Sequence, residues 1–139
     1  MNKTLNADLL ELVEMKTKLS TLTYDNKNYD EIEEQLHDLE DDFLEKYGEM
    51  LEDVISDAHE KIRSDNDTLL PIAYVGQRYT KTGDNDDGSA HYQVEHGEGV
   101  LIETELYPNK ETRLVFVPSP TRIELLVGGM KKDILWEDK

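Results

Sequence analysis

The first half of the chain repeats apolar residues every three or four positions. This spacing predicts amphipathic helix, and between residues 5 and 22 it is carried by Leu5, Leu9, Leu12, Met15, Leu19 and Leu22. Turn-forming residues interrupt it at 23–27. The stripe resumes at Tyr29 and runs to Ile62 without a proline. Two helices, a short one and a long one, therefore follow each other and predict an antiparallel helical hairpin.

The start of the longer helix carries an N-terminal signal. Asn28 is followed three residues later by Glu31, which predicts an approximate capping box with Asn28 as the N-cap. A helix of about 18 residues spans about 27 Å, and one of about 35 residues spans about 52 Å. Because of this mismatch, we expect the shorter helix to cover only the first half of the longer one.

The second half of the longer helix has a widened apolar face that needs cover. Its candidate packing residues are Tyr47, Met50, Leu51, Val54, Ile55, Ala58 and Ile62. Two occupants remain open at this point. The C-terminal half of the chain could pack on this face, or a second copy could pair with it, as in a homodimer in which two hairpins form a four-helix bundle.

The second half of the chain changes to a period of two, which is typical of strands. Polar residues at 64–67 and Pro71 end the helical pattern. Strands are predicted near 72–80, 91–96, 100–107, 113–117, 122–127 and 130–136, with Gly128-Gly129 as a hairpin turn between the last two. Leu101, Leu126 and Leu135 fall on faces that this pattern leaves solvated, so the buried faces stay ambiguous.

Together these patterns predict an α+β fold. Residues 1–66 form the acidic helical hairpin, and residues 67–139 form a five- to six-stranded antiparallel β-meander. The sheet is expected to pack on the second half of the longer helix, so that both regions make one integrated domain.

Charge adds a functional indication. The chain has 15 Lys and Arg against 32 Asp and Glu, a net charge of −17. Residues 30–67 alone hold sixteen acidic and three basic residues, a net charge of −13. Such a field repels nucleic acid and anionic lipid and favours a basic protein partner. The candidate partner-binding residues on the longer helix are Glu33, Glu34, Asp38, Glu40, Asp41, Asp42, Glu45 and Glu49.

The residue inventory excludes several chemistries. With no cysteine, disulfides, Cys-ligated zinc, iron–sulfur clusters and thiol catalysis are ruled out. No apolar run approaches the length of a membrane span. We therefore expect a cytoplasmic protein without a membrane or nucleic-acid partner.

Four small constellations could carry chemistry, and each has a simpler interpretation. Glu34 and His37 have the spacing of di-iron ligands but point away from the predicted core. Residues 84–88 resemble part of a calcium loop, yet the closing ligand would be Glu95, in a predicted strand. His91 and His96 face opposite sides of a strand. The fourth, Glu103 and Glu105, share a strand face and are expected to pair with Arg113 or Arg122.

The sequence therefore predicts no catalytic residue, metal or cofactor. The leading hypothesis is a non-enzymatic interaction or assembly protein that binds a basic partner, or itself, through the acidic helix and the apolar stripe. One alternative is a small-ligand or divalent-ion site, possibly catalytic, at the junction of sheet and helix, formed by Tyr74, Tyr79, His91, Tyr92, His96 and Tyr107. Another is an acidic mimic of nucleic acid.

Overall fold

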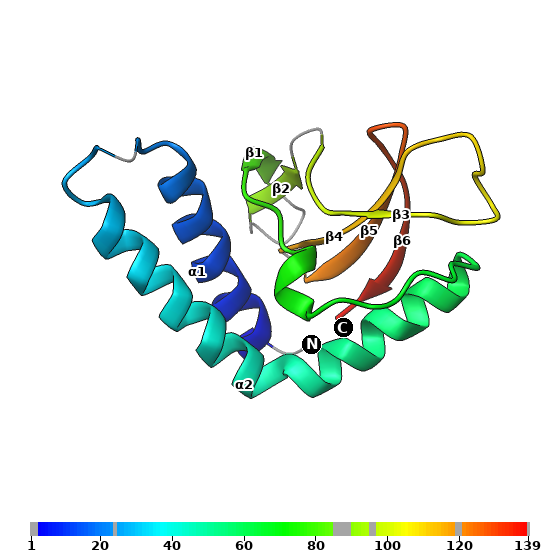
Figure 1. Cartoon of the computed structure of the whole chain (residues 1–139), viewed down its shortest axis with the longest axis horizontal. Helices are drawn as coiled ribbons and strands as arrows, with labels where there is room; N and C mark the ends of the chain where they lie inside the picture. The colour runs from blue at the N-terminus through cyan, green and yellow to red at the C-terminus, as the bar shows by residue number, and fades with distance from the viewer. Residues whose placement is uncertain (1–2, 24, 85–89, 95–96, 119–120, 139) are drawn as a thin grey trace.

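The computed structural model describes residues 3–23, 25–84, 90–94, 97–118 and 121–138. Two α-helices, a short 3₁₀ helix and six strands follow in order (Figure 1): α1 Lys3–Ser20, α2 Tyr29–Lys61, η1 Pro71–Tyr74, β1 Tyr79–Asp84, β2 Ala90–Val94, β3 Val100–Ile102, β4 Thr112–Val117, β5 Arg122–Val127 and β6 Met130–Glu137. The predicted α+β class, a short and a long helix followed by antiparallel strands, is confirmed. Among the described residues, no helix is long and apolar enough to cross a membrane.

α2 serves two packing partners along its length. α1 lies against its first half, and its second half runs beneath the sheet (Figure 1). Tyr47 links the two helices, because its hydroxyl donates to Asp8 Oδ2 over 2.6 Å. The helix bends near its middle, and its only glycine, Gly48, is the twentieth of its 33 residues. Glycine lowers local helix stability, so a bend costs least there.

The first turn of α2 departs from the predicted capping box. Asn28 occupies the N-cap position, but its backbone is helical (φ −96°, ψ −3°) and its side chain makes no capping hydrogen bond. A capping side chain needs an extended N-cap residue to reach back to the free N–H groups. Instead, the N–H of Asn28 donates to Asn26 Oδ1 over 2.9 Å. The capping-box prediction is therefore wrong.

The six strands divide between two antiparallel sheets instead of forming a single meander. β1 pairs with β2, and the larger sheet has the order β3-β4-β5-β6. An isolated parallel bridge between Val75 and Phe116 connects the segment after η1 to the larger sheet. Thr121, just before β5, donates to Asn6 Oδ1 over 2.9 Å. The start of α1 is thus tied to the sheet across 115 positions of sequence.

Two predicted strands are corrected. The segment 72–80 begins with η1, because Pro71 at its first turn favours a helical φ and Tyr74 turns inward to be buried. The predicted strand 100–107 ends at Ile102. Beyond it, the N–H of Glu103 donates to Asn66 Oδ1 over 2.6 Å, and the Thr104 hydroxyl donates to the carbonyl oxygen of Ile62. These bonds hold the chain to the end of α2 and away from β4.

Both faces of the central strands are buried. On one face, the cross-strand pairs Leu114–Leu125 and Phe116–Ile123 lie under η1, since the Tyr74 ring packs edge-on against Phe116. The opposite face carries Val115, Val117, Arg122, Glu124 and Leu126, all buried, and β2 covers it, because the Tyr92 carbonyl accepts from Arg122. A polar pair therefore lies inside the protein on the second face.

Candidate functional sites

The predicted apolar face of α2 lies mainly within the core. Tyr47, Leu51, Ile55, Ala58 and Ile62 are buried and belong to one cluster with η1 and the larger sheet. Val54 is half-buried, and Met50 is 39% exposed. Of the two occupants that the sequence left open, the strands and η1 of the same chain cover this face.

The predicted acidic residues of α2 divide into two groups. Glu33 and Glu40 are half-buried. Glu40 acts on Lys16 of α1: burial lowers the pKa of Lys16, whereas Glu40 and Glu98 raise it. The other six form what we call the acidic α2 surface: Glu34, Asp38, Asp41, Asp42, Glu45 and Glu49, all exposed. Among the described residues, none of the eight belongs to an ion pair.

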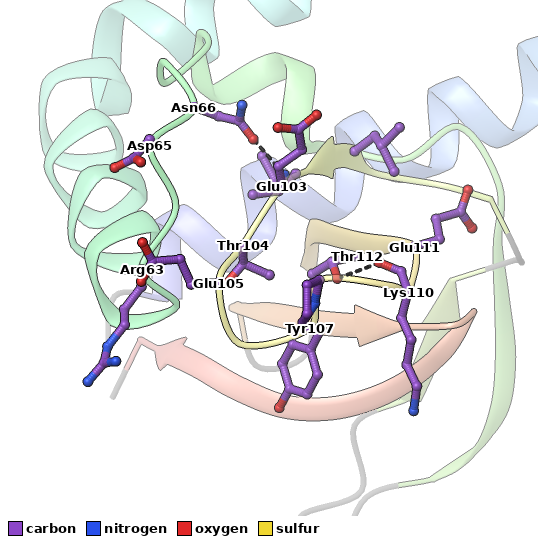
Figure 2. Close-up of a pocket in the computed structure, with 13 residues that line it drawn as sticks. Arg63, Asp65, Asn66, Glu103, Thr104, Glu105, Tyr107, Lys110, Glu111 and Thr112 are labelled. Atoms are coloured by element: carbon purple, nitrogen blue, oxygen red, sulfur yellow. Dashed lines mark hydrogen bonds between the residues drawn. The ribbon is translucent and has the colours of Figure 1, made fainter.

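A cavity of about 440 Å³ separates the end of α2 from the connection between β3 and β4 (Figure 2). Glu103 and Glu105 line it together with Arg63, Asp65 and Lys110. Both glutamates are exposed and lie after β3 instead of on a strand. Their predicted pairing with Arg113 or Arg122 is wrong, because Arg113 pairs with Glu111 at 3.1 Å and Arg122 with Glu124 at 2.8 Å.

Arg63, which lies beside this cavity two residues after the end of α2, has an unusual backbone conformation. Its φ is +54°, the one positive value among the described non-glycine residues. The N–H of Ser64 donates to the carbonyl of His59 over 3.0 Å, and that of Arg63 to Glu60 over 3.1 Å. Glycine usually occupies the left-handed position after a helix, since a Cβ raises its energy.

The other predicted constellations do not assemble into a site. His37 and Glu34 are both exposed, and the described part of the chain contains no group of three side chains able to hold a metal ion. Asp84 ends β1, while residues 85–89 and 95–96 lie outside the described residues, as does the side chain of His91.

The predicted site at the junction of sheet and helix does not form, because its tyrosines lie at different places in the structure. Tyr79 and Tyr92 share a cavity of about 330 Å³ against α1. Tyr107 lines the cavity at the end of α2. Tyr74 is buried beside His59. The side chain of His91 and the whole of His96 lie outside the described part of the chain. The described residues of this set therefore form no common pocket.

The sequence patterns missed a buried pair formed by His59 and Tyr74. His59 is 3% exposed, and its Nε2 lies 3.0 Å from the Tyr74 hydroxyl. That hydroxyl accepts from the N–H of Leu69 over 3.1 Å, so it can donate to a neutral imidazole. Burial lowers the pKa of His59 and raises that of Tyr74. The pair ties α2 to η1 in the uncharged form of both side chains.

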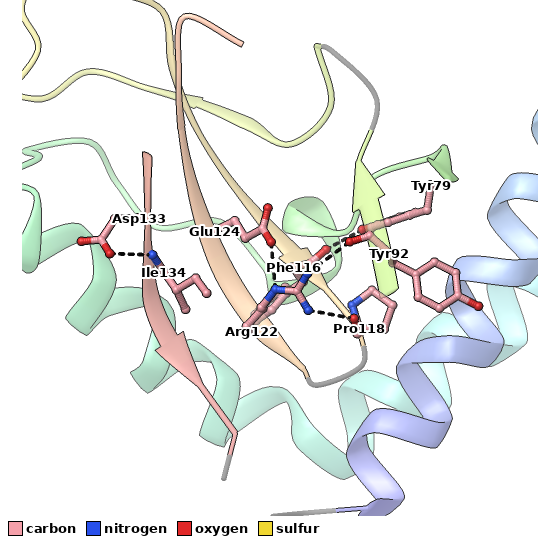
Figure 3. A network of polar contacts seen from close by, with 8 residues as sticks. All are labelled: Tyr79, Tyr92, Phe116, Pro118, Arg122, Glu124, Asp133 and Ile134. Carbon is pink, nitrogen blue, oxygen red and sulfur yellow. Dashed lines mark hydrogen bonds and ion pairs between the residues drawn. The ribbon is translucent and has the colours of Figure 1, made fainter. Parts of the chain in front are cut away.

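A second missed feature is the polar network of β5 (Figure 3). Arg122 Nε donates to Glu124 Oε2 over 2.8 Å, and its two terminal nitrogens donate to the carbonyls of Pro118 and Tyr92 over 3.0 and 3.2 Å. Nearby, the Tyr79 hydroxyl donates to the Phe116 carbonyl over 2.6 Å, and burial raises its pKa. One residue in the sequence could have indicated that this face is buried: Leu126 is apolar, although the pattern otherwise predicts a solvated face.

Comparison with known proteins assigns no family to this chain. No protein-family model, no curated protein and no solved structure matches it. Function therefore has to follow from the residues described above.

Proposed function

We propose that this protein is a non-enzymatic interaction protein whose acidic α2 surface binds a basic region of a partner protein. The observation that supports the proposal is the exposure of six carboxylates on one helix, none of them in an ion pair among the described residues. α1 packs against this half of the helix (Figure 1), and the six carboxylates nevertheless remain exposed to solvent.

Electrostatics gives this surface its expected mode of action. Complementary charges steer two proteins together and raise the association rate more than they slow dissociation. Salt screens exposed charges, with a Debye length of about 8 Å at physiological ionic strength. Binding through the acidic α2 surface should therefore weaken steeply as salt is added.

A basic partner is favoured over a second copy of the chain. Self-association was expected to use the apolar stripe, but Leu51, Ile55 and Ile62 are buried within one chain. The exposed surface that remains on the helix is mainly acidic, with Lys46 and Lys61 as its exposed lysines, and two surfaces of net negative charge repel each other.

The test compares two variants with equal net charge. In the first, the six carboxylates of the acidic α2 surface become Asn or Gln. In the control, six exposed carboxylates elsewhere do: Asp65, Asp67, Asp84, Glu103, Glu105 and Asp133. Each variant loses six negative charges from −17 and carries −11. Both variants and the wild type serve as bait in lysate from the native cell at low and high salt, with bound proteins identified by mass spectrometry.

The proposal predicts a basic protein that the wild type and the control retain at low salt, and that the α2 variant loses. The purified partner should then shift the amide resonances of residues 34–49 in a nuclear magnetic resonance titration. Equal loss from both variants would mean that total charge, not this surface, holds the partner. Equal retention by both would place the binding site elsewhere.

A further inference from the structure

Glu124 of the ion pair on β5 lines a further cavity. Arg122 and Glu124 are each 4% exposed and lie on the same face of the strand. Glu124 lines a cavity of about 360 Å³ between β2 and the turn that joins β5 to β6. This site is separate from the acidic α2 surface and from the cavity at the end of α2.

One oxygen of this buried carboxylate is left without a hydrogen-bond partner. Within the described part of the chain, Glu124 accepts only through Oε2, from Arg122. Figure 3 shows the other oxygen turned away from the guanidinium. The buried side-chain atoms of the described residues that lack a partner do not include this oxygen, so it opens to the cavity. A donor that enters the cavity can form a charge-assisted hydrogen bond with it.

The surroundings define what kind of donor fits. Arg122 already neutralises Glu124, and a second cation beside the guanidinium would meet like charge. Val94 and Leu126, both buried apolar residues, line the same cavity. A volume of about 360 Å³ lies at the lower end of the range for small-molecule sites. The complementary ligand is thus small, neutral and largely apolar, with one donor group.

We propose that this cavity binds a neutral small molecule that presents an N–H or O–H donor to the free oxygen of Glu124 and an apolar body to Val94 and Leu126. The proposal does not depend on the partner-binding function of α2. Its failure would leave that function untouched, and the reverse also holds.

A matched pair of probes tests the hydrogen bond directly. Indole has one N–H donor and no conventional acceptor, and 1-methylindole has a similar shape without the donor. Titration of the full chain, followed by amide resonances, should shift signals of Val94, Leu126 and Gly129, which line the cavity. Indole should bind at least about tenfold more tightly than 1-methylindole, as expected for a hydrogen bond to a charged acceptor.

Two variants and a control locate the effect. Glu124→Gln can still accept from Arg122 but turns an amide donor toward the cavity, so the preference for indole should fall to about onefold. Leu126→Phe keeps the ion pair and fills the cavity, so both probes should lose binding. Glu103→Gln, at the cavity beside the end of α2, should bind like the wild type.

The wild-type comparison holds even where a variant fails to fold. Equal affinity of the two probes for the wild type would overturn the proposal, as would the absence of shifts at the cavity up to the solubility limit of indole. A preference for indole that survives intact in a folded Glu124→Gln protein would overturn it as well.

Discussion

Truncation of Ile55 to alanine tests how the second half of α2 is covered. The side chain is 0% exposed and lies in the core cluster shared by α2, η1 and the larger sheet. Removal of a buried isoleucine costs the lost transfer energy plus the energy of the cavity left behind, about 2–5 kcal/mol in total. For a site with no solvent access we expect about 3–4 kcal/mol, a large part of the about 5–15 kcal/mol that stabilises a typical domain.

Urea denaturation followed by circular dichroism measures this loss. With an m-value of about 1.5 kcal/mol/M, typical for a small protein, the midpoint should fall by about 2 M at constant m. Met50→Ala is the matched control, since Met50 lies on the same helix but is 39% exposed. It should cost less than about 1 kcal/mol, in line with the smaller apolar area that it buries.

Two results would refute this reasoning. A loss below about 1 kcal/mol for Ile55→Ala would mean that the site is not a packed core position. A wild-type midpoint that rises with protein concentration would mean that a second copy, not the strands of the same chain, contributes to the cover.

Two further predictions concern the end of α2. Burial lowers the pKa of His59 in the folded protein below the 6.5 of a free imidazole. As the pH falls below about 6.5, His59 therefore binds a proton more readily in the unfolded chain than in the folded one, and the folded state loses stability. Urea midpoints at about pH 7.5 and pH 5.5 should show that His59→Gln loses less stability across this window than the wild type, and an equal loss would contradict the role of His59. Arg63→Gly should raise the free energy of unfolding by about 0.5–1 kcal/mol. The substitution relieves the strain of the left-handed φ of +54°, and this gain exceeds the entropy that the more flexible glycine loses on folding. A lowered urea midpoint would show that the arginine side chain contributes more than the strain costs.

Local patterns predicted the elements whose structure depends on near neighbours. The apolar spacing placed the longer helix from Tyr29 to Ile62, and α2 spans Tyr29–Lys61. The strand predicted at 122–127 coincides with β5. Gly128 and Gly129 both have positive φ, as a tight two-residue turn between right-twisted strands requires.

Features that depend on distant residues could not be predicted in the same way. The alternation of Arg122, Ile123, Glu124 and Leu125 is typical of a strand with one solvated face. That face is buried only because β2, about thirty positions earlier, lies over it. The cavity above Glu124 has the same origin: Leu126 indicates locally that the face is buried, but not which segment covers it. His59 was missed for a related reason, since its partner Tyr74 lies in a segment predicted as strand.

The order in which the ribosome makes these elements gives the charge of α2 a second consequence. β4 begins about fifty residues after α2 ends, which at typical synthesis rates is a delay of roughly 3–10 seconds. During that time the apolar row that includes Leu51, Ile55 and Ile62 has no sheet to cover it. The same stretch of helix carries Glu52, Asp53, Asp57 and Glu60, all exposed. Their repulsion should keep neighbouring nascent chains apart until β4, β5 and β6 arrive.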